Sequence, residues 1–264
     1  MNLADITPLI LTYNEAANIR ATLTRLQWAE QIVVVDSFSD DATLEILAAF
    51  PNVRTVQQKF ENHTQQWNFG LEQIETRWVL ALDADYQCTA ELISELKRLE
   101  PTHNVYSIKV DYAIFGAKLR TSLYPPRLSL FLVRDFQYQQ DGHTQLLKVD
   151  ASETVGHLKH ALIHDDRKSL DHWIHSQLKY ANLEAQKLMS RPKNELGWKD
   201  RIRRWYVLAP ILTLFYCLFC KLLILDGWPG IFYSFQRTFA ELLLSLKLLD
   251  QKFRNKNSST PDAS

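Results

Sequence analysis

The sequence predicts an α/β fold in which a mostly parallel sheet carries helices on both faces. Apolar segments of strand length alternate with segments of helical periodicity from residue 6 to residue 99. That order is typical of parallel sheets with crossover helices. At 264 residues, with 46% hydrophobic and 23% charged residues, the chain is also long enough to bury one sizeable α/β core and to carry an appendage.

The expected elements follow one another closely in the first hundred residues. Strands are expected at 6–12, 31–35, 53–56 and 78–82, and helices at 15–27, 41–49, 64–75 and around 92–99. Beyond residue 104 the pattern changes to short strands at 105–111 and 129–133, and then to a long helix at 169–189. We therefore expect an α/β domain over 1–190, a helical region over 191–254 and a disordered tail over 255–264.

The three cysteines indicate neither a disulfide framework nor a zinc site. Cys217 and Cys220 lie in an apolar stretch without a histidine beside them, and Cys88 is isolated. We expect these thiols to be small buried side chains. The sequence does not open with a basic stretch followed by an apolar one, so we expect the protein to stay in the cytosol.

A formal net charge of zero conceals an uneven distribution of charge. Residues 1–190 hold 18 Lys and Arg against 24 Asp and Glu, whereas residues 191–256 hold 12 against 5. A basic, apolar segment attached to an acidic body suggests an anionic surface such as a membrane leaflet. Nucleic acid is not an expected partner, because the basic residues flank apolar stretches and do not form a stripe.

The C-terminal apolar stretches allow three interpretations. Residues 205–225 carry one charge, Lys221, and approach the roughly 20 residues that cross a bilayer. Residues 231–249 are apolar but contain four polar or charged groups, which favours a helix lying in the membrane interface. Interfacial or re-entrant helices are the preferred interpretation, a hairpin of two spans is the second, and a buried helix pair in a soluble protein is the third.

Acidic residues follow two of the expected strands. Asp36 ends the second strand, and Asp83-Ala84-Asp85 directly follows the strand at 78–82. Ligands of parallel sheets bind at the carboxyl ends of the strands, where such side chains meet. Two carboxylates there suit Mn²⁺ or Mg²⁺ bound to a diphosphate, whose charge must be neutralised as it leaves. The alternative is that the acidic pair only caps a loop.

The first strand also ends in residues with the chemistry to bind a nucleotide. Tyr13 of Thr12-Tyr13-Asn14-Glu15 offers a ring that could stack on a base, and a helix is expected to follow at once. The free N–H groups at the start of a helix favour a pyrophosphate. The alternative is that Asn14 is an ordinary helix N-cap.

Taken in order, these motifs resemble those of the inverting family 2 glycosyltransferases, which have the GT-A fold. The motifs are Thr12-Tyr13-Asn14-Glu15, VVVDSFSDDAT at 33–43, NFGL at 68–71 and LDAD at 82–85, and they span about a third of the chain. Leu225-Asp226-Gly227 and Tyr180-Ala181 further resemble the branch that builds the lipopolysaccharide core. The Gln-x-x-Arg-Trp motif of the processive synthases is incomplete, because Arg201 stands where Gln is required before Arg204-Trp205.

The resemblance implies a role for each matching residue. Thr12, Tyr13, Glu15 and Asp36 would hold the nucleoside, with Asp36 on the base, and Asp83 would lie near the ribose and the metal ion. Asp85 would contact Mn²⁺ or Mg²⁺ directly, and Gln65 and Asn68 would frame the diphosphate. The basic residue that the family usually has before this Asn is Trp67 here, which leaves no cation at that position.

The catalytic base is expected in the segment 141–145. An inverting transfer needs a group that takes the proton of the acceptor hydroxyl. The related branch uses a His-Glu pair, and this sequence has Asp141-Gly142-His143-Thr144 instead. Asp141 is the candidate base and His143 an alternate or sugar-binding group, although an Asp-Gly turn between strands explains the same residues. A second acidic cluster, Asp165-Asp166-Arg167, could bind the acceptor or form a helix cap with its own ion pair.

The sequence therefore predicts an enzyme that moves a hexose from a nucleotide-diphosphate sugar, such as UDP-glucose, to a lipid-linked or lipopolysaccharide-type glycan. The expected place is the cytoplasmic face of the inner membrane of a bacterium. One alternative is a nucleotidyltransferase, which would need a basic Gly-rich loop after the first strand, and residues 12–20 contain no Gly. The other is a non-catalytic membrane-docked scaffold in envelope assembly.

Overall fold

The computed structural model describes residues 1–141, 144–192 and 195–258 and divides into two compact units. The first unit is Met1–Arg167 and the second is Lys168–Ser264. The division thus falls after Arg167 and not at residue 190, because the helix that follows packs on the last helix of the chain. The expected tail begins inside that last helix, which continues to Ser258, and its remaining residues, 259–264, lie outside the described residues.

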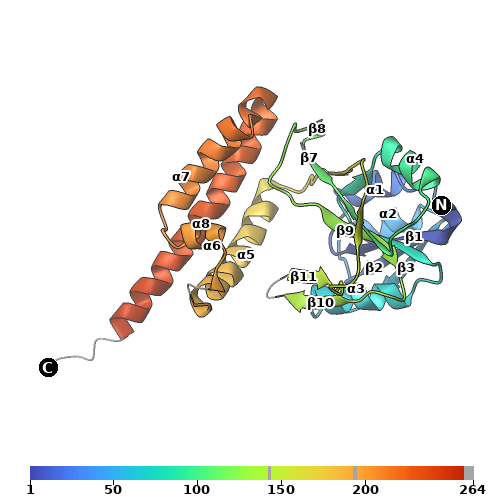
Figure 1. The fold of residues 1–264 in the computed structure, drawn as a ribbon, viewed down its shortest axis with the longest axis horizontal. Helices are drawn as coiled ribbons and strands as arrows, with labels where there is room; N and C mark the ends of the chain where they lie inside the picture. The colour runs from blue at the N-terminus through green and yellow to red at the C-terminus, as the bar shows by residue number, and fades with distance from the viewer. Residues whose placement is uncertain (142–143, 193–194, 259–264) are drawn as a thin grey trace. The chain divides into compact units, whose positions relative to one another are not determined.

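A seven-stranded sheet forms the centre of the first unit (Figure 1). Its strand order is β12-β6-β9-β4-β1-β2-β3, in which β3, β2, β1 and β4 run parallel and β9 is antiparallel to both of its neighbours. The expected α/β fold with a mostly parallel sheet is confirmed. The bounds of these strands are β1 Ile6–Thr12, β2 Ile32–Asp36, β3 Val53–Gln57, β4 Trp78–Asp83, β6 Val105–Ile108, β9 Arg127–Leu132 and β12 Val155–His157.

Two smaller sheets complete the first unit. One joins β5, β13, β7 and β8, and the other is the antiparallel pair of β10 and β11. The expected strand at 105–111 is divided between β6 and β7, which belong to different sheets. The bounds are β5 Tyr86–Cys88, β7 Val110–Ile114, β8 Ala117–Lys118, β10 Tyr138–Asp141, β11 Thr144–Leu147 and β13 Leu162–His164.

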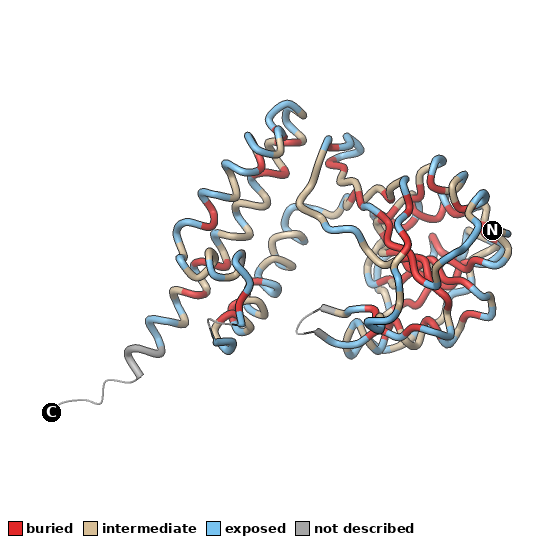
Figure 2. Tube along the Cα trace, in the orientation of Figure 1, coloured by how far each residue is buried: buried red, intermediate tan, exposed pale blue. Residues whose placement is uncertain are grey.

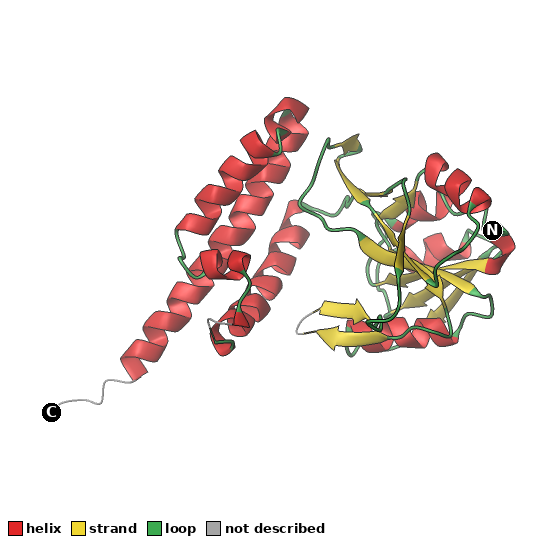
Figure 3. Cartoon of the chain, in the orientation of Figure 1, coloured by secondary structure: helices red, strands yellow, loops and turns green. Residues whose placement is uncertain are grey.

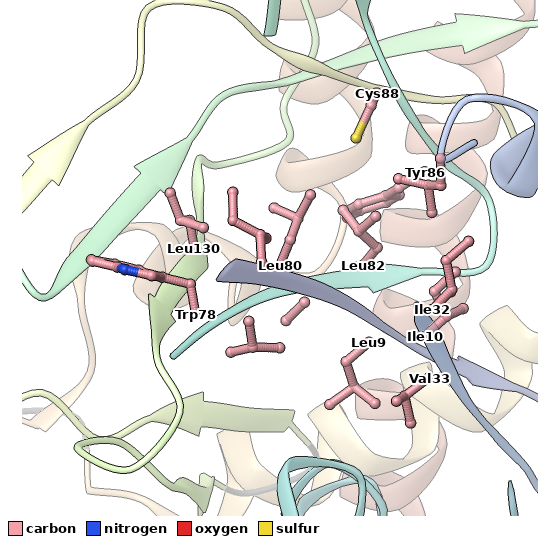
Figure 4. Close-up of a cluster of buried hydrophobic side chains, with 14 of the residues drawn as sticks. Leu9, Ile10, Ile32, Val33, Trp78, Leu80, Leu82, Tyr86, Cys88 and Leu130 are labelled. Atoms are coloured by element: carbon pink, nitrogen blue, oxygen red, sulfur yellow. The ribbon is translucent and has the colours of Figure 1, made fainter. Parts of the chain in front are cut away.

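Helices cover the central sheet, and buried side chains fill the space on both of its faces (Figures 3 and 4). The helices of this unit are η1 Leu3–Asp5, α1 Ile19–Thr24, α2 Thr43–Ala48, α3 His63–Glu72 and α4 Ala90–Arg98. Gly70 lets α3 approach the sheet closely, because a Cβ there would lie 2.7 Å from the Leu9 side chain and 3.1 Å from that of Val35. The small residue in the NFGL motif is thus a packing requirement of the fold.

The second unit is helical. Its elements are α5 Leu170–Ser190, α6 Trp198–Arg203, α7 Leu208–Phe215, η3 Tyr216–Cys220, η4 Leu223–Asp226 and α8 Trp228–Ser258. A small core joins α5 to α8 through Ala185, Leu188, Leu244 and Leu248. Arg203 adds an ionic link, because it lies 2.7 Å from Glu241 of α8 and 3.4 Å from Glu184 of α5.

The apolar stretch at 205–225 is not one helix. Tyr206 and Leu222 both have positive φ angles, 56° and 55°, and they bound the helical segment between them. Among the described residues, none of the helices combines the length and apolar character that a bilayer crossing requires. Many apolar residues of α7, η4 and the start of α8 are nevertheless exposed, and Figure 2 marks exposed residues along these elements.

Candidate functional site

The acidic residues of the sequence motifs meet at one edge of the central sheet. Strand β1 lies between β2 and β4, and all three run parallel. Thr12 at the end of β1 pairs in register with Asp36, and its neighbour Leu11 pairs with Asp83. Asp36 and Asp83 therefore flank the carboxyl end of the same strand, which is where ligands of parallel sheets bind.

Asp36 is fully buried and organises the loop that follows it. Its carboxylate accepts hydrogen bonds from the Thr12 hydroxyl at 3.0 Å and from Gln57 Nε2 at 3.3 Å. It also accepts both the backbone N–H and the hydroxyl of Ser39, at 2.9 and 2.5 Å. These four bonds fix the start of the loop at 37–41, so Asp36 shapes this edge of the sheet. Its contact with a base stays a prediction.

The loop after β1 differs from what the sequence predicts. Asn14 has a φ of 54°, and α1 begins at Ile19 after the N-cap residue Asn18, so Asn14 is not a helix N-cap. The Asn14 amide instead pairs with Asp40, donating at 2.8 Å and accepting from the backbone N–H at 3.0 Å. The late start and short length of α1 also mean that it does not present a helix terminus directly after the motif. Tyr13 is 57% exposed.

Asp83 forms an ion pair with Arg127 of β9. Nη1 of Arg127 bonds to Asp83 Oδ2 and also donates to the Tyr86 hydroxyl at 3.1 Å. The Arg127 guanidinium lies over the Tyr86 ring, 5.5 Å from its centroid. The neighbouring Asp83 raises the pKa of Arg127, and this effect outweighs that of burial. A cation therefore stands beside the first carboxylate of the acidic pair, although residue 67 supplies none.

Asp85 contacts His164 at the end of β13. The distance from Asp85 Oδ2 to His164 Nε2 is 3.1 Å, and both side chains are largely buried. Burial lowers the pKa of His164, but Asp85, Asp83 and Asp166 raise it more, so the net change is upward. Asp85, the second carboxylate of the acidic pair, therefore lies against His164.

Three tyrosines surround the His164 ring. The ring centroids of Tyr112 and Tyr124 lie 4.5 and 5.4 Å from it, and that of Tyr86 lies at 5.4 Å, nearly edge-on. Burial and then Asp83 raise the pKa of Tyr124, against the opposing effect of Arg127. Burial raises the pKa of Tyr86 as well, so Tyr86 and Tyr124 stay neutral. The three rings pack around the imidazole beside Asp85.

The donor set at this point fits a divalent cation. Carboxylate oxygens suit Mg²⁺ and Mn²⁺, and an imidazole nitrogen is a common ligand of transition metals. Asp83, Asp85 and His164 supply those three groups, and Arg127 holds one of the carboxylates in this structure. Through the described ranges, however, no three acidic, histidine or cysteine side chains already form a metal cluster.

Asn68 and Gln65 lie on α3 but face different surroundings. The Asn68 amide donates to the Tyr138 carbonyl at 3.0 Å and accepts from the Tyr138 N–H at 2.8 Å, which fastens β10 to α3. The Gln65 side chain is exposed. Trp67 is buried and stacks on Tyr138, with ring centroids 5.3 Å apart. Contacts of Asn68 or Gln65 with a diphosphate stay predictions.

The candidate base, Asp141, is the last residue of β10. Its backbone pairs with Thr144, the first residue of β11. His143 lies outside the described residues, as does the side chain of Asp141. Their catalytic roles therefore stay predictions.

The second acidic cluster connects β13 to the loop after β1. Asp165 is buried and pairs with Arg167, its Oδ2 accepting from Nε at 3.0 Å and from Nη2 at 2.9 Å. Asn18 donates to Asp166 at 2.9 Å and accepts from the Arg167 N–H at 2.8 Å. The expected ion pair is therefore confirmed, whereas the N-cap of α5 is Ser169.

The sequence did not identify Arg127 and His164 as site residues. Arg127 lies two residues before the expected start of its strand, and only the order β9-β4 places it beside Asp83. His164 comes 79 positions after Asp85 and reaches it because β13 pairs with β5. The one local indication of a site here is that the short segment Leu162–His164 ends in a histidine and is followed directly by two aspartates.

Comparison with known proteins establishes the family. The model described as "Glycosyl transferase family 2" matches residues 9–147, more than half of the chain. The chain belongs to the family 2 glycosyltransferases. The matched region contains all four motifs and ends with β11. This membership removes the nucleotidyltransferase alternative.

Two relatives and one solved structure are similar to this glycosyltransferase. An uncharacterized glycosyltransferase of Rickettsia prowazekii (strain Madrid E) is 23% identical, with 97% of this chain and 91% of the relative covered. One of Rickettsia bellii (strain RML369-C) is 24% identical, with 92% and 85% covered. The mannosyltransferase PcManGT from Pyrobaculum calidifontis, in complex with GDP-Man and Mn²⁺, is 15% identical with a TM-score of 0.52, and the match covers 96% of this chain and 88% of that one. The likeness supports the GT-A-like fold.

Proposed function

We propose that this glycosyltransferase moves a hexose, with inversion, from a nucleotide-diphosphate sugar such as UDP-glucose to a lipopolysaccharide or other envelope glycan. One observation carries the proposal. The acidic pair after β4 faces His164 and Arg127 at the same sheet edge as the loops that follow β1 and β2. A site of this kind places ligands for a cation at the ends of parallel strands, where the ligands of such sheets bind.

The donor would lie across the ends of β2, β1 and β4. Thr12, Tyr13, Glu15 and Asp36 would hold the nucleoside, and Gln65 and Asn68 would frame the diphosphate. Asp83, Asp85 and His164 would hold Mn²⁺ or Mg²⁺. Such an ion, when bound, neutralises the charge that develops on a departing diphosphate. A Mn²⁺ complex of PcManGT supports the choice of cation by fold analogy alone.

The transfer itself would be a single displacement. The acceptor hydroxyl oxygen attacks the anomeric carbon opposite the diphosphate, the bond from that carbon to the diphosphate oxygen breaks, and the hydroxyl proton passes to a base. Asp141 is the proposed base, with His143 as an alternate or as a group that binds sugar. The position of Asp141 at the end of β10, the strand that Asn68 of α3 bonds through Tyr138, supports this assignment.

The proposed class of acceptor is inferred from sequence motifs in the second unit. Leu225-Asp226-Gly227 forms the turn between η4 and α8, and Gly227 has a φ of 65°, which only glycine adopts without strain. That turn and Tyr180-Ala181 on α5 are the features shared with the lipopolysaccharide-core branch. Addition of one sugar is favoured over polymerisation, because Arg201 interrupts the motif of the processive synthases.

A screen of nucleotide sugars by thermal shift tests the proposed donor. With Mn²⁺ present, the correct donor at about a hundred times its Kd should raise the Tm of the full chain by about 5 °C, because ligand binding stabilises the folded state. Asp85→Asn should abolish most of that increase while keeping the shape of the side chain. If no UDP-, GDP- or other nucleotide sugar raises the Tm, a non-catalytic scaffold becomes the better interpretation.

We also propose that the second unit docks on the cytoplasmic face of a bacterial inner membrane without crossing it. Trp228 is 81% exposed at the start of α8, and Ile211, Phe215 and Leu225 are exposed on the segments before it. Exposed apolar groups of this size mark an interaction surface. The excess of basic residues over 191–256 suits anionic lipid headgroups, although Arg203 is engaged by carboxylates within the unit.

Flotation with vesicles tests the membrane proposal. The full chain should float with vesicles that contain phosphatidylglycerol and much less with purely zwitterionic ones, because both apolar burial and charge contribute. The double variant Leu225→Ser and Trp228→Ser should lose most of the binding. A matched change of an exposed aromatic residue in the first unit, Phe60→Ser, should bind as the wild type does. Equal flotation of all three proteins would contradict the proposal.

A further inference from the structure

Phe38 adopts a backbone conformation that the fold alone does not explain. Its φ is 60°, in the left-handed region, and the residue is 56% exposed. Bulky residues rarely take this conformation, because the Cβ atom crowds the carbonyl oxygen. A glycine would adopt it without strain. A strained aromatic residue that contributes little to a buried core is typical of a residue kept for a function other than stabilising the fold.

The surrounding loop maintains this conformation. Asp36 accepts hydrogen bonds from the N–H and the hydroxyl of Ser39, the residue that follows Phe38. Asn14, in the loop after β1, pairs with Asp40 through two hydrogen bonds, and the Asn14 N–H donates to the Ser39 hydroxyl at 2.9 Å. These contacts tie the loop at 37–41 to the loop after β1. They fix the backbone next to Phe38, and the Phe38 side chain takes no part in them.

Tyr13 emerges from the adjacent loop with similar exposure. The Ser37 N–H donates to the Thr12 carbonyl at 2.9 Å and extends the β1–β2 ladder beyond the strands, so residues 13 and 38 both follow the last rung. Tyr13 is 57% exposed, and neither its ring nor that of Phe38 contacts another ring or a cation within the described chain. Two unsupported aromatic side chains therefore lie at the edge of the sheet that holds the acidic pair.

The buried carboxylate beneath these rings is already engaged. Asp36 accepts four hydrogen bonds from its own chain, from Thr12, Gln57 and Ser39. A base that bonded to it would have to displace one of these donors. Flat aromatic faces, in contrast, can receive a base without breaking any contact, since every base has a π-face.

We propose that Phe38 forms, with Tyr13, the stacking surface for the nucleobase of the nucleoside diphosphate, and that its backbone strain is retained for this binding role. The proposal rests on the proposed function, since it names how the donor's base is held. Phe38 thereby gains a binding role that the sequence motifs did not predict. Asp36 then positions the loop that carries Phe38.

Two variants separate the ring from the backbone strain. Phe38→Gly removes both, and Phe38→Ala removes the ring but keeps a Cβ in the left-handed region. Phe115 is a matched control, because it also has a positive φ, 51°, and is 77% exposed, but it lies in the turn after β7. Isothermal titration should measure UDP, GDP and inorganic pyrophosphate, each with Mn²⁺, against the full chain, and calorimetry should measure the Tm.

The proposal predicts opposite signs for binding and stability. Phe38→Gly should weaken the preferred nucleoside diphosphate about tenfold, as expected for a lost base stack, leave pyrophosphate binding unchanged and raise the Tm by about 2 °C. Phe38→Ala should weaken nucleotide binding equally without raising the Tm. Phe115→Gly should raise the Tm and leave nucleotide binding unchanged.

Three outcomes would overturn the proposal. Unchanged nucleotide affinity in both Phe38 variants would remove the stacking role. Equal loss of pyrophosphate and nucleotide affinity, or a fall in Tm for Phe38→Gly, would mean that Phe38 only supports the loop. If the wild-type chain binds neither UDP nor GDP, the proposed function is overturned as well. Unchanged binding in the Phe38 variants would overturn only the stacking role.

Discussion

At the scale of single residues, the acidic pair depends on partners that lie far from it in the sequence. Asp83 and Asp85 were expected from the LDAD motif, and the structure adds Arg127 from β9 and His164 from β13. Short-range patterns predict which residues end a strand, because strand ends follow from local periodicity. They do not predict which side chains a distant strand brings to that point, since that depends on sheet order and register.

Replacement of Arg127 by Gln should destabilise the first unit. The change leaves the Asp83 carboxylate without its cation and the Tyr86 hydroxyl without its donor, and we expect a loss of about 2 kcal/mol in the free energy of unfolding. Urea denaturation measures it. Arg134→Gln is the control, because Arg134 is exposed on the same segment. Equal stability of the two variants would show that the ion pair contributes nothing.

Replacement of His164 by Ala should weaken the binding of Mn²⁺ more than it weakens the fold. His164 lies 3.1 Å from Asp85 and either coordinates the ion or orients the carboxylate that does. Loss of such a group lowers metal affinity by about 10- to 100-fold. Titration of Mn²⁺ by electron paramagnetic resonance in the presence of UDP measures the change. His175→Ala, on the exposed face of α5, should bind Mn²⁺ as the wild type does.

At the scale of elements, the strands were predicted well and the loops between them poorly. Residues 6–12, 32–36 and 78–83 are almost continuously buried, and such strands are evident from apolar content alone. The start of α1 was missed, because the pairing of Asn14 with Asp40 is a long-range contact that replaces the expected cap. The division of 105–111 into β6 and β7 was missed, because both halves are apolar and only their sheets differ.

The contact between α4 and the turn before β13 should make stability depend on pH in the acid range. Glu95 accepts the N–H groups of Lys159 and His160, each at 2.9 Å, and pairs with the His160 ring at 2.8 Å. Burial raises the pKa of Glu95, but these bonds lower it more. A lowered pKa stabilises the folded state above the ordinary pKa, and this stabilisation is lost as the pH falls through the lowered value.

Glu95→Gln tests that dependence. At pH 7 the variant should be less stable by about 1–2 kcal/mol, because an amide cannot accept all three donors. As the pH is lowered below the ordinary carboxyl pKa, the difference from the wild type should shrink towards zero, which chemical denaturation at several pH values would measure. A difference that stays constant with pH would mean that the charge of Glu95 does not contribute.

The first turn of α8 should tolerate no side chain at Gly230. A Cβ there would lie 1.9 Å from the Leu223 carbonyl oxygen and 3.0 Å from Asp226 Cβ, and the nearest of these atoms is backbone. Gly230→Ala should therefore cost the second unit about 1–3 kcal/mol, as overpacking does. Circular dichroism melting measures the cost. Gly197→Ala is the control, because its Cβ would meet nothing within 4 Å.

At the scale of the whole molecule, composition predicted two regions but not their boundary. The chain divides into two compact units after Arg167, whereas the change from an acidic to a basic, apolar composition comes after residue 190. The sequence predicts a helix with many polar positions at 169–189, within the expected first domain. The buried stripe of Ala185 and Leu188 on this helix, α5, instead packs on α8, and such pairing of helices is not readable from one helix alone.

We propose that the carboxylates after β4 hold a cation that makes a nucleoside diphosphate a good leaving group. Release of nucleoside diphosphate from the donor identified by thermal shift, with Mn²⁺ and an envelope glycan extract, measures this most directly. We expect turnover by the wild type and a loss of about a hundredfold or more in Asp85→Asn, the scale expected when transition-state charge loses a stabilising group. Equal turnover by the two proteins would contradict it.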